Sequence, residues 1–598
     1  MKRLRRMRRN IKYFFPILLK VNPFSIVFIL LSALIKAGFG VATVYLPKLI
    51  IENLMLEPKP DFMAVFIIAI SYCLLLGFTY VSTKILDMIN TYYAFKADEK
   101  IEAMFNEKVV TIDYFNIEDP KFADDIAFAR QSLWAYSGGI YSFVRTVRSI
   151  IESILTMISI IGVIIFSGLP WYITLIFIVI VILYATFGYI IQTKREDIYE
   201  EHNKSIVRTS RKQWYYNSSV LNFRMHKLLR SYNSEPLLDK YSDGINKEVN
   251  DKNIELTKKY SKASLGYFTN YYFVGVLLVV LVLVFSYFKF GITIATLTAL
   301  YTAVRNLSNQ LYDAVFTMVS YDRDCIYQEN YINFMEKESI FKNGTIKLES
   351  IKTIEFKNVS FKYPRTEDYV LQDLSFKIND KERVSLVGVN GSGKTTIIKL
   401  MCRFYDVDDG EILINGINIK DYDYDSYMKQ LAVVFQDFKV ISFTIKDNIM
   451  IDEENHEKLY DCLERAQVLD KVLSFPNKEN TYINRWFDPN GVEFSGGELQ
   501  KFAFARTLYK DASFVVLDEP TSALDVISED KIYSDFNEIV GEKTCLYISH
   551  RLSSCLFCDK IIVLEGSKII ETGTHYELMK LDGHYAKMFK AQAKYYND

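Results

Sequence analysis

Long apolar stretches in the first half of this 598-residue chain constrain its fold most, because about 20 apolar residues in a row cross a bilayer as a helix. Six such stretches follow one another, at 24–49, 62–85, 150–166, 171–191, 265–287 and 292–311. Six spans return the chain to the side on which it began. A tail rich in Lys and Arg precedes the first span, which is longer than a secretory signal, so it predicts a retained membrane helix with the N-terminus inside. We therefore expect a multi-pass protein of a bacterial plasma (inner) membrane, with both termini cytoplasmic.

The connections between the spans alternate in length. Those after the first, third and fifth spans are a few residues long, whereas segments 86–149 and 192–264 are long and mix charged with apolar residues. Neither long segment is rich in Gly, Pro or Ser, so the pattern predicts that the membrane helices continue into the cytosol.

Charge and cysteine content exclude several classes of protein. Lys and Arg total 71 and Asp and Glu total 72, which gives no bulk attraction to nucleic acid. The seven cysteines are odd in number and lack the paired spacing of a disulfide or zinc framework. We expect a lipid bilayer, and no nucleic acid, among the partners of the chain.

A change of pattern at 336–350 predicts a domain boundary. The sequence turns polar there, and beyond it short β-type runs alternate with helical ones, as in an open α/β domain. The expected architecture is an α-helical six-span transmembrane domain at 1–335, a linker at 336–350 and an α/β P-loop ATPase domain at 351–598.

A phosphate-binding loop stands at the start of the second domain. An apolar strand at 383–387 runs into Gly-Val-Asn-Gly-Ser-Gly-Lys-Thr-Thr, and a helical pattern follows. In such a loop, backbone N–H groups surround phosphate oxygens, Lys394 reaches the β and γ phosphates, and Thr395 ligands Mg²⁺. The predicted ATP contacts in this loop are Gly388, Asn390, Gly391, Ser392, Gly393, Lys394, Thr395 and Thr396.

A second apolar strand, at 514–518, ends in two adjacent carboxylates. Asp518 at such a strand end can bind Mg²⁺, and Glu519 can polarise the attacking water. Acidic residues also occur at strand ends simply because strands stop at the surface. About 120 residues after a phosphate-binding loop, however, the pair indicates an ATPase.

Between these motifs lies Phe-Ser-Gly-Gly-Glu-Leu-Gln-Lys, beginning at Phe494. It resembles the signature motif of ATP-binding cassette (ABC) proteins, in which the start of a helix in one subunit caps the γ-phosphate held by the other. Ser495 and the amides of Gly496 and Gly497 are suited to that role. The most frequent family form has Gln where this chain has Glu498, and a negative charge there is tolerable only if it points away from the phosphate.

Other elements of the ABC family follow in order over about 190 residues. Tyr363 resembles the aromatic residue that stacks on adenine, and Gln436 the glutamine that contacts Mg²⁺ and water. Asp525 lies in a segment that resembles the D-loop, and His550 resembles the switch histidine. The resemblance assigns catalysis to Glu519, His550, Gln436 and Lys394, and Mg²⁺ ligation to Thr395, Gln436 and Asp518.

The resemblance implies an exporter-type half-transporter that binds ATP and Mg²⁺ and couples ATP hydrolysis to export. Its cargo is expected to be a peptide, a lipid or an amphipathic drug-like molecule. Because each chain supplies half of each ATP site, a second half-transporter subunit is required; a homodimer is favoured and a heterodimer remains open. The alternative function is an ATP-gated channel or a regulatory ABC subunit.

Two further regions bear on coupling and cargo. Segment 117–126 resembles the family's first coupling element, with Phe122 as its anchor in the motor domain; the alternative is simply a helix N-terminus near Pro120. Segment 221–226 is a weaker second candidate. Lys36 and Arg305 lie near the centres of spans one and six. Cations at that depth should face a watery pathway, with Asn309 and Tyr312 on the face of Arg305, or form an internal ion pair, for example with Asp313. Two cations in a cavity would suit an anionic cargo.

Overall fold

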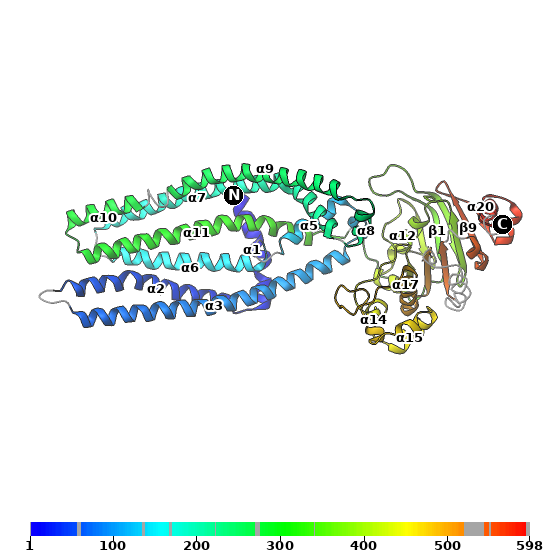
Figure 1. The fold of residues 1–598 in the computed structure, drawn as a ribbon, viewed down its shortest axis with the longest axis horizontal. Coiled ribbons are helices and arrows are strands. Elements are labelled where there is room, and N and C mark those ends of the chain that lie inside the picture. The colour runs from blue at the N-terminus through cyan, green and yellow to red at the C-terminus, as the bar shows by residue number, and fades with distance from the viewer. Residues whose placement is uncertain are drawn as a thin grey trace. The chain divides into compact units, whose positions relative to one another are not determined.

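We describe the protein from a computed structural model (Figure 1). It describes residues 2–56, 61–133, 138–166, 170–221, 223–269, 276–339, 341–451, 453–519, 543–548 and 552–593. The chain forms two compact units. A helical unit contains 1–112 and 120–338, and a motor unit contains 113–119 and 339–598. The short segment 113–119, which the sequence places inside the first domain, therefore belongs to the motor unit.

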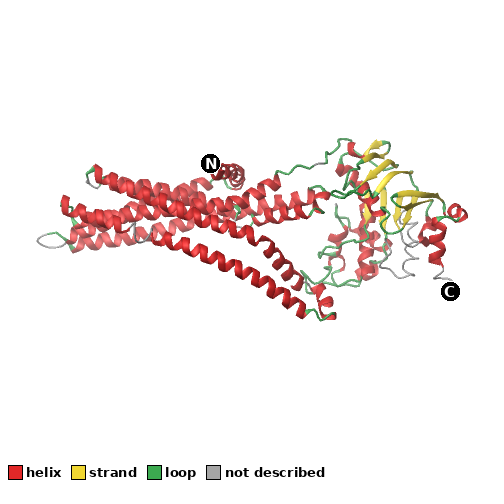
Figure 2. Cartoon of the chain, turned by 90° about the horizontal axis from the view of Figure 1, so that it is seen from above, coloured by secondary structure: helices red, strands yellow, loops and turns green. Residues whose placement is uncertain are grey.

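The helical unit consists of long antiparallel helices joined by short connections (Figure 2). Its helices are α1 (Lys2–Val21), α2 (Ser25–Leu54), α3 (Phe62–Thr111), α5 (Pro120–Gln131), α6 (Ile140–Ile165), α7 (Trp171–Leu221), α8 (Phe223–Ser231), α9 (Glu235–Phe268), α10 (Val276–Phe290) and α11 (Ile294–Met335). At 1.5 Å per residue, the 50 residues of α3 extend for about 75 Å, far beyond a hydrocarbon core of about 30 Å. The prediction that the membrane helices continue past the membrane is confirmed.

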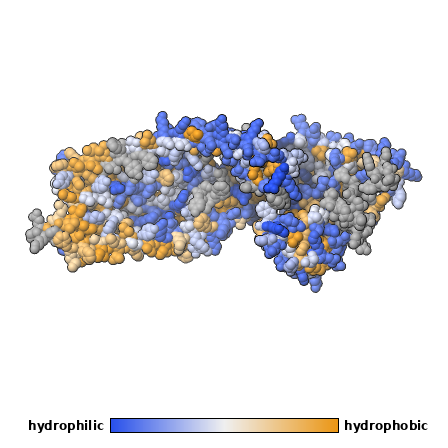
Figure 3. All heavy atoms as spheres, in the orientation of Figure 1, coloured by the Kyte–Doolittle hydropathy of each residue, from blue (hydrophilic) through white to orange (hydrophobic). Residues whose placement is uncertain are grey.

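Among the described residues, four helices are long and apolar enough to cross a membrane: Ser25–Leu54, Phe62–Thr111, Ile140–Ile165 and Thr174–His202. A shorter apolar segment lies at Val280–Lys289, and α11 covers the sixth predicted span without meeting the same criterion. The count of six spans stays a prediction. Hydrophobic side chains gather on the surface at the end of the helical unit that holds α10 and the adjacent ends of α2 and α3 (Figure 3). That distribution is typical of lipid contact.

Two local features define the starts of membrane helices. The Asp61 side chain accepts a hydrogen bond from the Ala64 amide and caps α3, and Thr293 caps α11 in the same way.

At the N-terminus, Phe14 and Leu18 of α1 are buried, while Arg6 forms ion pairs with Asp322 and Glu329 of α11. The basic tail therefore packs within the helical unit.

Two sheets build the motor unit. One is antiparallel in the order β2-β1-β4-β5, from β2 (Leu371–Ile378), β1 (Ile354–Phe361), β4 (Asp409–Ile414) and β5 (Ile417–Asn418). The other has the order β10-β9-β3-β8-β7-β6, from β10 (Lys568–Gly573), β9 (Lys560–Glu565), β3 (Arg383–Gly388), β8 (Thr544–Ile548), β7 (Phe514–Asp518) and β6 (Leu431–Val434). All its neighbours pair in parallel except β9 and β10. The predicted fold class, a helical membrane region followed by an ABC-type α/β domain, is confirmed.

The strands that carry the predicted site are buried on both faces. Every residue of β7 and β8 is buried, as expected for near-continuous apolar runs in a parallel sheet. Because β3 and β7 both pair in parallel with β8, their carboxyl ends lie at the same edge of the sheet. The phosphate-binding loop and the two carboxylates follow these strand ends, so the topology brings them together.

The remaining helices of the motor unit are α4 (Tyr114–Ile117), α12 (Lys394–Met401), α13 (Tyr424–Lys429), α14 (Ile445–Ile449), α15 (His456–Arg465), α16 (Leu469–Leu473), α17 (Gly496–Lys510), α19 (His575–Leu581) and α20 (His584–Ala593). A separate apolar cluster joins α14, α15 and α17, including Leu459, Leu463 and Phe502. This cluster holds the start of α17, where the Ser-Gly-Gly motif lies.

Candidate functional site

The loop between β3 and α12 has a backbone that only glycines adopt easily. Gly391 and Gly393 have φ angles of +82° and +100°, and a Cβ on Gly393 would lie 2.6 Å from the Leu371 side chain. Gly393 is also the residue before the first turn of α12. Backbone N–H groups at this helix start have no partner within the helix, so the loop offers donors to an anion.

Two side chains of the loop fit a phosphate group. The Ser392 hydroxyl is buried and has no hydrogen-bond partner among the described residues. The Lys394 ammonium donates to the carbonyl oxygens of Gly388 and Val389, at 2.8 and 3.0 Å. Burial lowers the pKa of Lys394, although Glu519 and Asp518 act in the opposite direction. An anion in this loop would give the Ser392 hydroxyl a hydrogen-bond partner and would balance the charge of the Lys394 ammonium.

At the neighbouring strand end, Asp518 is buried and receives a hydrogen bond from Thr395. Burial, together with the charge of Glu519, raises the pKa of Asp518 to about 6, although Lys394 and the hydrogen bond from Thr395 act in the opposite direction. A hydroxyl and a carboxylate side by side are oxygen ligands of the kind that Mg²⁺ prefers. The donor set therefore fits the predicted metal.

Glu519 follows β7 with a φ angle of +49°, which is uncommon for a residue with a side chain. Its amide donates to the Ile548 carbonyl at 2.9 Å, which ties this backbone to β8. The Gln436 side-chain amide donates to the Glu519 carboxylate at 2.7 Å. Strained backbone of this kind clusters at functional sites, and here it places the carboxylate beside the loop that carries Lys394.

Tyr363 lies half-buried beside the phosphate-binding loop. Its ring packs edge-on against Phe361 and Tyr405, with centroids 5.2 and 5.4 Å apart. Its hydroxyl lies 3.0 Å from the Thr396 hydroxyl. Adenine stacking by Tyr363 stays a prediction.

The signature segment begins α17, where Ser495 and Glu498 form a reciprocal cap. The Ser495 hydroxyl accepts from the Glu498 amide at 3.3 Å, and the Glu498 carboxylate accepts from the Ser495 amide at 2.8 Å. The other carboxylate oxygen of Glu498 pairs with Lys471 of α16. Burial favours the neutral acid, but Lys471 and the Ser495 contacts outweigh it and hold the pKa of Glu498 below its usual range.

The unusual acid is thus bound within its own unit: its carboxylate lies at the start of α17, where the Ser495 amide donates to it and Lys471 balances its charge. That it points away from a bound phosphate stays a prediction. The Ser495 hydroxyl accepts a hydrogen bond there and keeps its own proton for donation to a ligand. Lys471 belongs to none of the sequence motifs. Its role is visible only from its ion pair with Glu498 in the folded chain.

The structure thus brings together Lys394, Thr395, Gln436, Asp518 and Glu519. In the part of the chain that the structure describes, the Ser495 side chain hydrogen-bonds only with Glu498. That arrangement leaves the signature segment available to another subunit. Asp525 and His550 lie outside the described residues.

Segment 113–119 packs within the motor unit through aromatic and charged contacts. Tyr114 stacks on Phe404, with centroids 4.3 Å apart. Glu118 accepts hydrogen bonds from Tyr405 and from Lys399, the latter at 2.9 Å. Burial favours the neutral form of Glu118, but these hydrogen bonds prevail and lower its pKa.

Phe122 is not the anchor in the motor domain, so that prediction is wrong. It belongs to the helical unit, where it is 3% exposed and packs against Phe334 with centroids 5.7 Å apart. The coupling element was expected at 117–126; its contacts with the motor are made by residues 114–119, because the chain turns into α5 at Pro120. For the second element, Asn222 lies outside the described residues, and its role stays a prediction.

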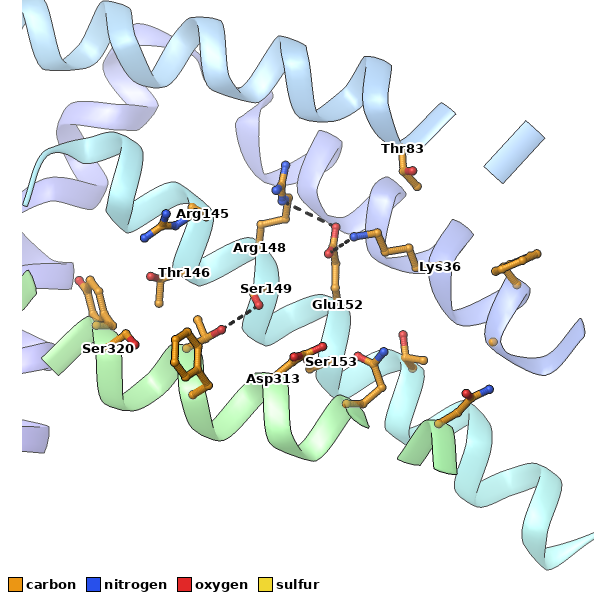
Figure 4. Close-up of a pocket in the computed structure, with 18 of the residues that line it drawn as sticks. Lys36, Thr83, Arg145, Thr146, Arg148, Ser149, Glu152, Ser153, Asp313 and Ser320 are labelled. Atoms are coloured by element: carbon orange, nitrogen blue, oxygen red, sulfur yellow. Dashed lines mark hydrogen bonds and ion pairs between the residues drawn. The ribbon is translucent and has the colours of Figure 1, made fainter. Parts of the chain in front are cut away.

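The helical unit contains a polar cavity of about 1080 Å³ (Figure 4). Lys36 lines it, as expected for a residue that faces a watery pathway, and it forms an ion pair with Glu152 of α6. The suggested partner Asp313 also lines the cavity but is not the residue that pairs with Lys36.

The face of α11 that lines the cavity differs by one position from the predicted face. Asn306, Gln310 and Asp313 line it, whereas Arg305 is exposed and is not among the lining residues. Lys36 therefore both faces the cavity and forms an internal ion pair, whereas Arg305 does not line the cavity. These two cations thus give no support to an anionic cargo.

Comparisons with known proteins agree with this architecture. Residues 371–522 match the family model of the ABC transporter. The subtilin transport ATP-binding protein SpaT of Bacillus subtilis is 29% identical over 94% of this chain and 90% of its own length. An ATP-dependent lipid A-core flippase of Photobacterium profundum is 32% identical over 61% of this chain and 63% of its own length.

Among solved structures, a bacterial Atm1-family ABC exporter with ATP bound superimposes with a TM-score of 0.79, covering 95% of this chain and 98% of that one. At 21% identity, this likeness establishes the fold alone. The phosphate-binding loop, the carboxylates after β7, the signature helix and the fused membrane helices are thus found together in one chain. The protein belongs to the ATP-binding cassette transporters, as an exporter-type half-transporter in which a multi-pass membrane domain is fused to an ATPase domain.

Proposed function

We propose that this chain acts as a homodimer, in which two composite sites hydrolyse ATP and drive export of an amphipathic substrate. ATP-driven export is the activity of this type of transporter, and half-transporters act in pairs. The observation that supports the homodimer is the presence of the full set of site residues on one chain. In addition, the Ser495 hydroxyl hydrogen-bonds only within its own helix, among the residues that the structure describes. The ATPase domain and both termini then lie in the cytoplasm of a bacterial cell.

Within each site, we assign the roles that the sequence predicts. Lys394 and the loop from Gly388 to Thr396 bind the phosphates, and Tyr363 stacks on adenine. Glu519 takes the proton of the attacking water, held in position by Gln436, and His550 completes the site. Thr395, Asp518 and Gln436 hold Mg²⁺, which supplies charge neutralisation to the phosphates. Ser495, Gly496, Gly497 and Asp525 come from the other subunit.

A complementation experiment tests the composite homodimer. Lys394→Ala and Ser495→Arg chains should each form inactive dimers, because both sites of each dimer carry one defective half. Co-expressed with different tags and purified through both, the mixed dimer contains one site with two intact halves. We expect it to trap nucleotide at that site with vanadate, while neither parent dimer does. Equal trapping in the mixed dimer and in the parents would contradict the composite arrangement.

The pairing of Glu498 with Lys471 yields a second prediction. Lys471→Met should leave the Glu498 charge without its partner near the start of α17, which binds the γ-phosphate in the proposal. For a pair that is partly exposed, we expect a loss of roughly 1 kcal/mol, or about fivefold in kcat/KM for ATP.

The matched control is Glu498→Gln in the Lys471→Met background, which removes the charge itself. Activity should return to within about twofold of the Glu498→Gln chain, because no unpaired charge remains. An equal loss in both backgrounds would show that Lys471 acts by packing and not through Glu498.

A further inference from the structure

We propose that the cavity of the helical unit contains a site for a cationic group of the transported substrate, with Asp313 as the anionic partner of an ammonium. This inference deepens the proposed export function and rests on it. The geometry points to the cavity end where α11 presents Asp313 toward Ser153 of α6 (Figure 4).

The charges of the cavity are almost all matched by neighbours. Glu152 pairs with Lys36 and lies 3.8 Å from Arg148. At the opposite end, Arg323 lies 3.5 Å from Glu196 and 3.7 Å from Asp324. In these pairs, most of the charged side chains that line the cavity are neutralised by one another without a ligand.

Asp313 differs from the other acids of the cavity. It lines the cavity and is exposed there, and among the described residues it forms no hydrogen bond and no ion pair within 4 Å. The charge of Lys36 acts on it, but Lys36 is itself paired with Glu152. In Figure 4, dashed lines join Glu152 to Lys36 and to Arg148, and none reaches Asp313. A carboxylate that faces a cavity without a direct ion-pair partner favours a ligand that brings a positive charge.

The cavity that Asp313 lines suits an organic cation. Phe316, Phe39 and Tyr80 line the same cavity, and aromatic faces attract ammonium and guanidinium groups. Asn306 and Gln310 precede Asp313 by about two turns and one turn of α11 and offer amide groups. A cavity of about 1080 Å³ exceeds the usual size of a site for a small ligand, so it can also hold the apolar body of an amphipathic molecule.

Arg145 gives the site a direction. The Ser149 hydroxyl of α6 lies 3.1 Å from the Thr317 hydroxyl of α11, so these two residues lie at the same height along the two helices. Asp313 lies about one helical turn from that height in one direction, and Arg145 lies about one turn from it in the opposite direction. The two charges are thus separated by about 12 Å along α6. Arg145 lies over the Tyr141 ring at 5.9 Å and repels a cation, so the ammonium is directed to the Asp313 end.

The test uses the full-length dimer in lipid nanodiscs and a short amphipathic leucine–lysine peptide as probe, with binding measured by thermophoresis without ATP. Two analogues carry acetylated or succinylated lysines, which remove or reverse the charge. We expect the wild type to bind the lysine peptide about tenfold more tightly than the acetylated one, and Asp313→Asn to abolish most of that preference. The ratio of peptide-stimulated to basal ATP hydrolysis should follow the same order.

Two variants serve as controls. Asp313→Glu keeps the charge and should retain the preference, and Glu255→Gln removes an exposed carboxylate of α9 that does not line the cavity and should behave as wild type. A full preference in Asp313→Asn, or tighter binding of the succinylated peptide by the wild type, would overturn the site. If Asp313→Asn fails to fold, a wild type that binds all three peptides equally overturns it. In each of these cases, the proposed function would still be supported if basal ATP hydrolysis by the protein is lost in Glu519→Gln.

Discussion

Replacing Glu519 with Gln lowers steady-state ATP hydrolysis by at least about 10²-fold, because an amide of the same shape cannot accept the proton of the attacking water. The carboxylate already accepts a hydrogen bond from Gln436 at 2.7 Å, and a Gln side chain can preserve that contact through its carbonyl oxygen. The geometry of the site should therefore survive the change, and the loss should appear in kcat. Phosphate release from the purified protein measures it.

The same variant should keep its affinity for ATP and accumulate the closed dimer. Spin labels on the two motor domains should come closer when ATP and Mg²⁺ are added, and they should remain so. The matched control is Gln436→Glu, which places two carboxylates side by side and should impair activity without leaving a tightly closed dimer, because like charges repel. Near-normal turnover in Glu519→Gln would remove Glu519 from the role of general base.

The second large effect is expected from the combined change Tyr114→Ala and Glu118→Ala. Tyr114 contributes a stacked contact with Phe404, and Glu118 accepts hydrogen bonds from Lys399 and Tyr405. These contacts hold segment 113–119 in the motor unit, while the chain on both sides of the segment belongs to the helical unit. Closure of the motors can bias the membrane helices only through contacts of this kind.

We expect a loss of transport of about five- to thirtyfold, which corresponds to roughly 1–2 kcal/mol after the exposure of Glu118 is allowed for. Basal hydrolysis should remain within about twofold, because neither residue belongs to the ATP site. Uptake into inverted vesicles and phosphate release measure the two rates. Glu367→Gln, an exposed carboxylate of the same unit, is the control and should transport normally.

Phe122→Ala serves as a contrast to this pair. Phe122 is a buried core residue of the helical unit, so its truncation should destabilise the protein by about 3–5 kcal/mol. We expect lower yield and a lower melting temperature, with hydrolysis and transport falling together. Selective loss of transport in Phe122→Ala, with unchanged stability, would return the coupling role to Phe122.

The sequence by itself determined the parts of this protein whose chemistry is local. A glycine loop between a strand and a helix, with Lys394 and Thr395 at its end, predicts phosphate binding because its donors all come from one short segment. The apolar stretches likewise determined that the chain is a membrane protein, because the hydropathy of a segment depends on that segment alone.

Only the tertiary structure decided which side chains from distant elements meet. Lys471 neutralises Glu498 although no motif links them, and Glu152, rather than Asp313, pairs with Lys36. The cavity face of α11 depends on how that helix is rotated against α6, and one position along a helix turns a side chain by about 100°. Arg305 and Phe122 were misplaced for the same physical reason. A helical pattern shows which residues share a face, but the packing of neighbouring helices decides what that face meets.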